Sequence, residues 1–199
     1  MKALVLALLV LALATPAFAD STADQFVLAA APQGTFSQSG TLNLDKFSLT
    51  LLGFASQNVF ENLFEKNLGP TETGLGLALG THDEISRTGF IQLDLTQILT
   101  RHPSEIQVLM SSIQGDDAYD VWGSNTQGIL GAGLLSNQTK PSFTIPDLGK
   151  YDFVSIGVAS GDVLIEDITV HTSEPSVPLM LCLGFVVFLI YKRMVLHGK

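Results

Sequence analysis

Short segments that alternate apolar and polar residues run through residues 41 to 171, and they constrain the fold more than any other feature of the chain. In "FIQLDL", Ile91 and Leu93 would share one face of an extended strand and Gln92 would lie on the other. Gly, Asn, Asp and Pro separate these segments, as they do at turns between strands. Strands at this spacing are typical of a sandwich or a barrel. We expect an all-β, two-sheet antiparallel sandwich that is jelly-roll-like, with one or two short helices.

Residue type and spacing also indicate where the individual elements lie. Strands are expected in "TLNLDKFSLTLL" (41–52), "GLGLALG" (74–80), "EIQVLMSSI" (105–113), "YDFVSIGVAS" (151–160) and "DVLIEDITVH" (162–171). A Ser-Gly-Asp turn at residues 160–162 predicts that the last two form a hairpin. Helical spacing in "SQNVFENLFEKN" (56–67) and "LTQILTRH" (95–102) indicates the two short helices. The predicted core contains Ile91, Leu93, Val108, Phe153 or Val154, Ile156 and Ile168.

Residues 1–19 have the pattern of a secretory signal peptide. Lys2 precedes an apolar stretch, and Ala17 and Ala19 form a small-residue cleavage site, so cleavage is expected before Asp20. Residues 20–172 then form the exported domain, which is long enough for one domain with its own core.

The charge and cysteine content of the exported part excludes several classes of function. Six basic residues stand against nineteen acidic ones between residues 20 and 174, a net charge of −13 that repels nucleic acid and anionic lipid. The only cysteine, Cys182, lies near the C-terminus. The domain therefore has no disulfides, no cysteine-based zinc site and no cysteine nucleophile.

A short apolar segment close to the end of the chain is expected to form a transmembrane helix. Residues 173–178, "SEPSVP", form the linker, because two prolines cannot easily continue a strand or a helix. Residues 179–199 form the helix and its basic tail; the apolar core of about 15 residues spans roughly 22 Å of helix, against a hydrocarbon thickness near 30 Å. Lys192 and Arg193 stop this segment on the cytoplasmic side, which places the domain on the periplasmic side.

The order of Glu174-Pro175-Ser176, the apolar run and the basic pair resembles the PEP-CTERM sorting signal of exported bacterial proteins. The resemblance implies that the chain is held in the inner membrane until an exosortase, a membrane transpeptidase-like enzyme, cuts near Pro175. The sequence departs from the family pattern in having Ser173 where a first proline usually stands, and in the extra "MVLHGK" at its end.

The body of the chain is similar to the β-sandwich ectodomain common among PEP-CTERM proteins. "TGLGLALGTHDEIS", "FIQLDL", "VWGSNTQGILG" and "YDFVSIGVASGDVLIEDITV" occur in that order. The resemblance implies a non-enzymatic surface protein that is processed by an exosortase. Such a protein would be associated with the cell envelope or with the exopolysaccharide or biofilm matrix. No nucleic-acid partner is expected. Two alternatives remain: a carbohydrate-binding module or weak glycan-acting enzyme, and a plain C-terminally anchored envelope protein that is not processed.

An acidic turn, "QGDDAYD", contains Asp116, Asp117 and Asp120. Carboxylates grouped on a loop are the ligands that calcium prefers, so calcium is the one cofactor we consider, and it would bind here. The turn lacks the residue order of a known calcium loop, and a polar turn is the competing interpretation.

Trp122 and Asn125 lie beside this acidic turn in "DVWGSNTQG". An exposed tryptophan next to Asn and Asp suits the stacking of a sugar ring, which makes Trp122 and Asn125 candidate ligand contacts. A tryptophan that fills the gap between two sheets is the more usual arrangement in a sandwich, and it is the interpretation that we favour.

Catalytic motifs are absent from the sequence: there is no G-x-S-x-G, no H-E-x-x-H and no phosphate-binding glycine loop. "HDE" at His82, Asp83 and Glu84 has metal-ligand side chains, but neighbouring residues on a strand point to opposite faces, so at most His82 and Glu84 could share a site. A solvated loop is the simpler interpretation, and no catalytic residues are assigned.

Overall fold

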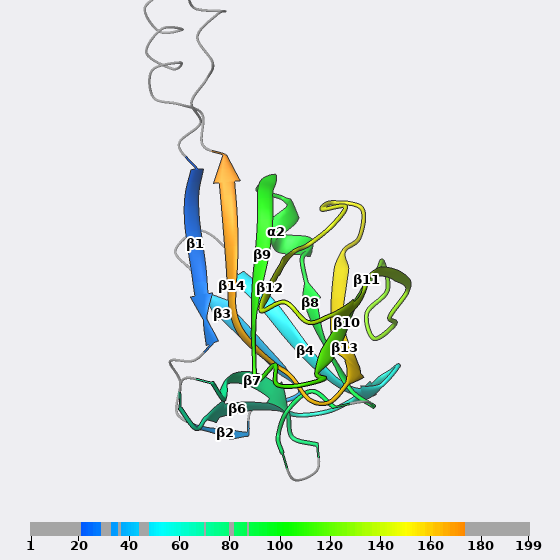
Figure 1. Ribbon diagram of the computed structural model, residues 1–199. Coiled ribbons are helices and arrows are strands. Elements are labelled where there is room, and N and C mark those ends of the chain that lie inside the picture. The colour runs from blue at the N-terminus through cyan, green and yellow to red at the C-terminus, as the bar shows by residue number, and fades with distance from the viewer. Residues whose placement is uncertain are drawn as a thin grey trace, which may run out of the picture. The chain divides into compact units, whose positions relative to one another are not determined.

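The computed structural model describes residues 21–28, 33–35, 37–43, 48–69, 71–79, 82–86 and 88–173, and Ala23–Thr172 form one compact unit. Within it the strands pair antiparallel in two sheets, as Figure 1 shows, so the expected all-β, two-sheet sandwich is confirmed. We call the sheet that contains β14 sheet A and the sheet that contains β13 sheet B.

Strands of sheet A and strands of sheet B are interspersed along the chain. Sheet A has the order β12 (Ser142–Thr144), β9 (Pro103–Ser111), β14 (Leu164–Ser173), β7 (Thr73–Leu77), β6 (Leu63–Asn67) and β2 (Gly34–Thr35), and β1 (Ser21–Val27) also pairs with β14. Sheet B has the order β11 (Ala132–Gln138), β10 (Ala118–Ser124), β13 (Phe153–Ser160), β8 (Phe90–Asp94), β4 (Ser48–Ser56) and β3 (Ser39–Asn43), and β5 (Val59–Phe60) also pairs with β4. Neighbours in the chain such as β7 and β8, or β9 and β10, therefore lie in different sheets.

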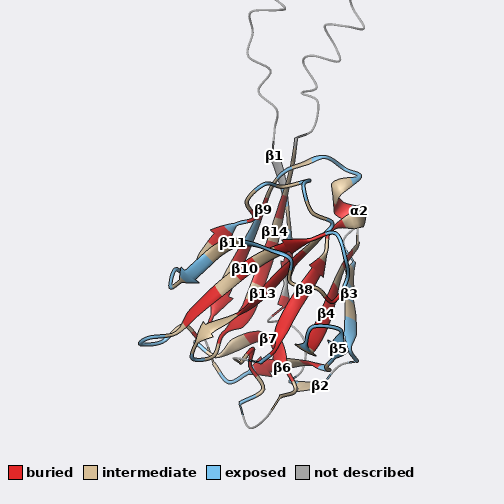
Figure 2. Ribbon diagram, turned by 90° about the vertical axis from the view of Figure 1, so that its right-hand side faces the viewer, coloured by how far each residue is buried: buried red, intermediate tan, exposed pale blue. Residues whose placement is uncertain are grey.

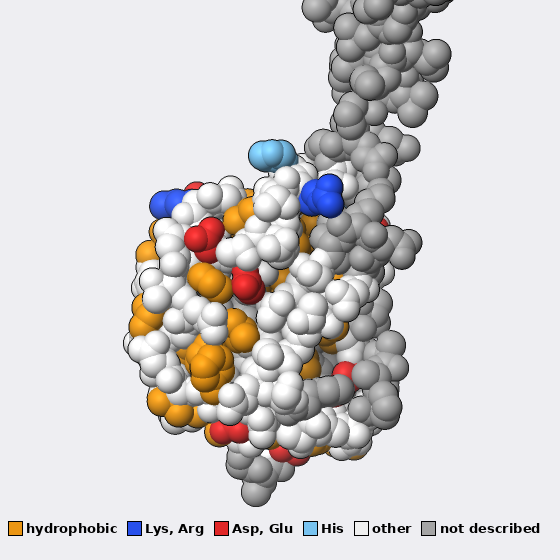
Figure 3. Space-filling view, turned by 180° about the vertical axis from the view of Figure 1, so that it is seen from behind, with side chains coloured by type: hydrophobic (Ala, Val, Ile, Leu, Met, Phe, Trp, Pro, Cys, Tyr) orange, Lys and Arg blue, Asp and Glu red, His pale blue; other side chains and the backbone are white. Residues whose placement is uncertain are grey.

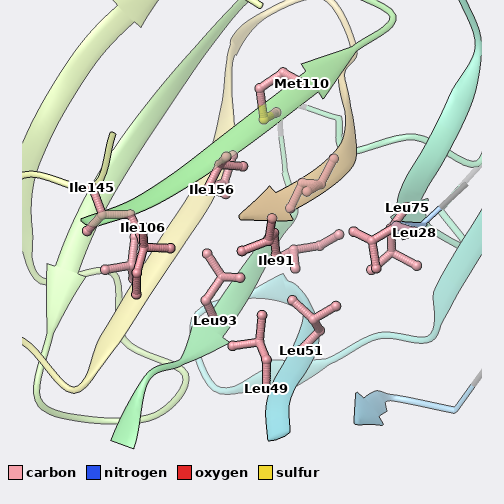
Figure 4. Packing of buried hydrophobic residues seen from close by; sticks show 14 of the residues in the cluster. Leu28, Leu49, Leu51, Leu75, Ile91, Leu93, Ile106, Met110, Ile145 and Ile156 are labelled. Carbon is pink, nitrogen blue, oxygen red and sulfur yellow. The ribbon is translucent and has the colours of Figure 1, made fainter. Parts of the chain in front are cut away.

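The core lies between the sheets, where the alternation of each strand places its apolar residues. Ile91, Leu93, Val108, Val154, Ile156 and Ile168 are each at most 1% exposed, which confirms the predicted core and selects Val154 over Phe153. Figure 2 shows buried residues running along both sheets, and Figure 4 shows side chains of sheet B, such as Ile91, in one cluster with Ile106 and Met110 of sheet A. Burial of this one cluster is the main source of stability.

Close packing between the sheets leaves room for only a hydrogen atom at Gly53 of β4. A Cβ atom there would lie 2.5 Å from the backbone oxygen of Glu61 and 2.9 Å from Cδ2 of Leu77 on β7. The N–H of Glu61 also donates a hydrogen bond of 2.9 Å to the Gly53 carbonyl. This glycine therefore allows β4, the segment after β5 and sheet A to approach one another.

Three of the local predictions were wrong. The turn at residues 160–162 does not close a hairpin, because β13 pairs with β8 and β10 in sheet B whereas β14 pairs with β7 and β9 in sheet A. The segment 41–52 is not one strand but contributes to two, β3 and β4, which pair with each other. The segment 56–67 forms a turn, β5 and β6 in place of a helix, with Asn58 at a φ of 62°.

The second predicted helix is confirmed as a single turn, α2 (Thr96–Leu99). Asp94 holds its start: one carboxylate oxygen accepts hydrogen bonds from the Thr96 N–H at 3.0 Å and from the Thr96 hydroxyl at 2.6 Å. Ile98 on its inner side is fully buried. The buried side chain of Ile98 and the hydrogen bonds between Thr96 and Asp94 are sufficient to stabilise one helical turn.

The first and last strands of the domain, β1 and β14, lie side by side and run in opposite directions in Figure 1. The chain therefore enters and leaves the domain at the same end. The expected signal peptide (1–19), Asp20, the sorting motif and the expected transmembrane segment lie outside the described residues. No helix among the residues that the structure describes is long and apolar enough to cross a membrane.

Candidate functional site

The three carboxylates of the acidic turn serve different parts of the structure. Asp117 Oδ2 accepts a hydrogen bond of 2.8 Å from the N–H of Gln114, which closes the turn, and Asp120 Oδ1 accepts one of 2.7 Å from the N–H of Asn137 on β11. The side chain of Asp116 is exposed. In the described part of the chain no group of three His, Cys, Asp or Glu side chains is arranged to hold a metal. Calcium binding at this turn stays a prediction, and it would require these carboxylates to turn toward one another.

Trp122 lies on the outer face of sheet B, half-buried, and does not fill the space between the sheets. Its strand neighbours Tyr119 and Val121 are fully buried and belong to the core cluster. Trp122 instead reaches over Gly157 of β13, where a Cβ atom would lie 3.1 Å from Cζ3 of the indole. The favoured core interpretation was therefore wrong, because the alternation of β10 places Tyr119 and Val121 inside.

Three phenylalanines form a stack on the same outer face. Phe54 of β4 stacks on Phe90 of β8 with ring centroids 4.9 Å apart, and on Phe60 of β5 with centroids 4.7 Å apart. Phe54 and Phe90 are almost fully buried and form, with Leu52, a cluster separate from the main core, whereas Phe60 is 42% exposed. Sheet B thus carries aromatic side chains on the face that points away from sheet A.

A loop between β10 and β11, residues 125–131, covers the middle of this face. We call it the strap. Gln92 of β8 holds it, because Gln92 Oε1 accepts a hydrogen bond of 2.8 Å from the Gly128 N–H and Gln92 Nε2 donates one of 3.2 Å to the Ile129 carbonyl. The Oδ1 of Asn125 accepts a hydrogen bond of 3.0 Å from the Asp152 N–H. The side-chain oxygen of Asn125, a candidate ligand contact, is therefore already used to fix the strap.

Lys66 and Glu84 form an ion pair inside the domain. Lys66 Nζ contacts Glu84 Oε1 directly and lies 3.1 Å from Glu72 Oε2. The hydroxyl of Ser112 donates a hydrogen bond of 3.0 Å to the second oxygen of Glu84. The exposures of Lys66 and Glu84 are only 7% and 6%, so the pair is shielded from solvent. In the "HDE" segment, His82 is exposed, as a solvated loop predicts, but Glu84 points inward.

The electrostatic balance at Lys66 favours the charged ammonium. Burial taken alone would lower the pKa of Lys66, but hydrogen bonds and charges from Glu84 and Glu72 outweigh it, and the net pKa lies above its ordinary value. A lysine that stays protonated cannot act as a base or a nucleophile. The cluster of Lys66, Glu72, Glu84 and Ser112 therefore joins β6 to the segment before β8. Its geometry indicates a structural role.

A hollow of about 490 Å³ opens beside this cluster. It is lined by Thr71, Met110, Ser111, Ser112, Ile113, Gln114, Pro141 and Glu166. Ser112 borders both the hollow and the ion pair. The volume is within the range of small-molecule sites, and Glu166 is the only ionisable group among the lining residues, so the hollow could receive a small polar molecule but contains no pair of groups for acid and base chemistry.

Charged groups are sparse on the surface seen in Figure 3. Hydrophobic side chains lie there among uncharged groups, and the Lys and Arg residues visible in this view lie near the upper edge of the domain.

The strap, the phenylalanine stack and the buried ion pair were not found from the sequence. Alternation predicted that Gln92 would lie opposite the core, but nothing in the local pattern showed that residues 125–131 would cover it.

Comparisons with protein-family models, with curated proteins and with solved structures found no match to this chain.

Proposed function

We propose that this chain is an exported, membrane-tethered surface protein of PEP-CTERM type that acts by binding and not by catalysis. Its C-terminal segment, residues 179–199, would hold it in the inner membrane with the domain on the periplasmic side. An exosortase-like enzyme would cut near Glu174-Pro175-Ser176, and the released domain would associate with the cell envelope or the exopolysaccharide matrix. We also assign the sandwich to the jelly-roll type, since consecutive strands such as β9 and β10 lie in different sheets.

The observation that carries the proposal is where the compact domain begins and ends. It spans Ala23–Thr172, so it starts just after the expected cleavage before Asp20 and stops just before Glu174. The pairing of β1 with β14 brings both ends of the domain to one side. A domain held at one end by a short proline-containing linker would present that linker to a membrane enzyme without needing to unfold.

The test changes Glu174 and Pro175 together to alanine in the full chain, expressed in a host that has an exosortase. Intact mass and fractionation into inner membrane, outer fractions and medium are measured. The wild-type domain should be recovered with a mass that lacks the C-terminal segment, and the variant should stay uncut in the inner membrane. A control variant, Asp147→Ala, removes an exposed acidic side chain far from the linker in sequence and should be processed as the wild type is.

Equal masses and locations for the wild type and the Glu174/Pro175 variant would instead support the plain anchor. Deletion of residues 177–199 frees the domain under both interpretations, so this deletion serves as the marker for the released form. A measured enzymatic activity of the purified chain on a glycan would contradict the non-catalytic part of the proposal.

A further inference from the structure

The phenylalanine stack on sheet B has one open end. The rings of Phe90 and Phe54 lie at an interplanar angle of 16°, and those of Phe54 and Phe60 at 26°, so the three rings follow one another in nearly parallel planes. Phe90 is 3% exposed, Phe54 is 1% exposed and Phe60 is 42% exposed. Only the last ring of the stack reaches solvent, and it does so on a support of two buried rings.

The position of Phe60 is fixed before any ligand arrives. Phe54 and Phe60 are paired across β4 and β5, and the turn that joins these strands contains Asn58 in a left-handed conformation. The N–H of Asn58 donates a hydrogen bond of 2.9 Å to the Gly128 carbonyl of the strap, and Gln57 Oε1 accepts one of 3.4 Å from the Leu130 N–H. A ring held in this way loses little freedom on binding.

The residues around Phe60 in the chain determine which ligand the ring suits. Asn58 and Asn62 are exposed and carry uncharged carboxamide groups, as does Gln57, whose Oε1 already accepts the Leu130 N–H. Val59 adds an exposed apolar side chain. Glu61 is the one charged residue among residues 57–62, and its Oε1 accepts a hydrogen bond of 2.8 Å from the Asn62 N–H. The net charge of −13 between residues 20 and 174 disfavours anionic polymers and anionic lipid surfaces.

We propose that Phe60 is a binding platform for a neutral polysaccharide. The apolar C–H face of a sugar ring packs on the exposed face of Phe60, and the sugar hydroxyls exchange hydrogen bonds with the neighbouring carboxamides. This inference deepens the proposed association with the matrix and rests on it for the presence of a glycan. It differs from the sequence-based hypothesis, which assigned the contact to Trp122 and Asn125.

The test uses the full chain in a sugar-free zwitterionic detergent. Electrophoretic retardation is measured in gels containing hydroxyethylcellulose, galactomannan or dextran, each neutral, and in gels containing anionic polygalacturonate. The wild type should be retarded by at least one neutral polymer and not by polygalacturonate. Phe60→Ala and Phe60→Leu should weaken that retardation by about tenfold, whereas Phe60→Trp should retain it, because a ring and not only apolar area is required.

The matched control is Leu68→Ala, which removes another exposed hydrophobic side chain, 61% exposed, and should leave retardation unchanged. Circular dichroism confirms that each variant is folded. The proposal is overturned if no neutral polymer retards the wild type, if only polygalacturonate does, or if Phe60→Leu binds as well as the wild type. It is also overturned if Phe60→Ala abolishes a concentration-dependent dimer in sedimentation while leaving retardation intact. None of these results bears on cleavage at Pro175, so the two proposals fail separately.

Discussion

Gln92 Nε2 on β8 donates a hydrogen bond to Ser155 Oγ on β13, 3.0 Å away, and both residues are completely buried on the face of sheet B that points away from the core. The same carboxamide holds the strap through Gly128 and Ile129. A strand residue that alternation places toward solvent has thus become the attachment point of a loop. Buried polar groups of this kind are stable only when their partners are present.

Replacing Gln92 by leucine should therefore destabilise the domain. The variant would leave the Gly128 N–H and the Ser155 hydroxyl without their present partner, and we expect a loss of about 2 kcal/mol in the free energy of unfolding. Chemical denaturation of the full chain measures it. Gln127→Leu, an equal change at an exposed position of the strap, should cost less than about 0.5 kcal/mol. Equal effects at both positions would show that Gln92 does not hold the strap.

Gly53→Ala should disturb the contact between β4 and sheet A. The added methyl group would overlap the Glu61 carbonyl oxygen, which is backbone and cannot move away freely, and we expect a cost of about 1 to 3 kcal/mol. The control is Gly34→Ala on β2, where no atom lies within 4 Å of the added methyl group. Thermal unfolding of the two variants should give a clearly lower Tm for Gly53→Ala alone, and matching Tm values would contradict the packing described for Gly53.

Lys66→Met should be strongly destabilising, because it leaves the Glu84 carboxylate buried without its cation. We expect a loss of about 3 to 5 kcal/mol. Changing both partners, Lys66→Met with Glu84→Leu, should recover most of this loss. Lys150→Met is the matched control, since Lys150 pairs with Asp147 at the surface, with exposures of 59% and 58%, and its loss should be far less destabilising than the loss of Lys66. A double variant no more stable than Lys66→Met would contradict this account of the pair.

Tyr119 should make the fold sensitive to alkali. Burial raises the pKa of Tyr119 to about 12 from an ordinary value near 10, and its hydroxyl donates a hydrogen bond of 2.9 Å to the Lys140 carbonyl. The folded state therefore favours the protonated phenol, so this contribution to stability is complete below pH 10 and is lost as the pH rises toward 12. Tm measured between pH 9 and about 12 should fall less steeply for Tyr119→Phe than for the wild type. Equal slopes for the wild type and Tyr119→Phe would contradict this account of Tyr119.

Part of this protein could be predicted from the amino-acid sequence because strand patterns are local. The alternation in "FIQLDL" identified Ile91 and Leu93 as core residues, and "EIQVLMSSI" did the same for Val108. Each of these positions is determined by the period of two residues along an extended chain, whichever strand lies beside it. The short helical turn at residues 96–99 was also predictable, since Asp94 and Thr96 make their contacts within three positions.

Other features were decided by contacts between distant segments. The same alternation fits either sheet, so the sequence could not show that β13 and β14 part at residues 160–162, or that Phe60 would pair with Phe54 in place of forming a helix. Gln92 and the strap are separated by more than thirty residues, as are the paired strands β8 and β13. The sequence by itself determined that most segments are strands, which face of β8 and β9 is buried, and that the domain is acidic. Only the tertiary structure decided which strands meet, which polar groups are buried and which aromatic ring is exposed, because each depends on the packing of segments that no local pattern relates.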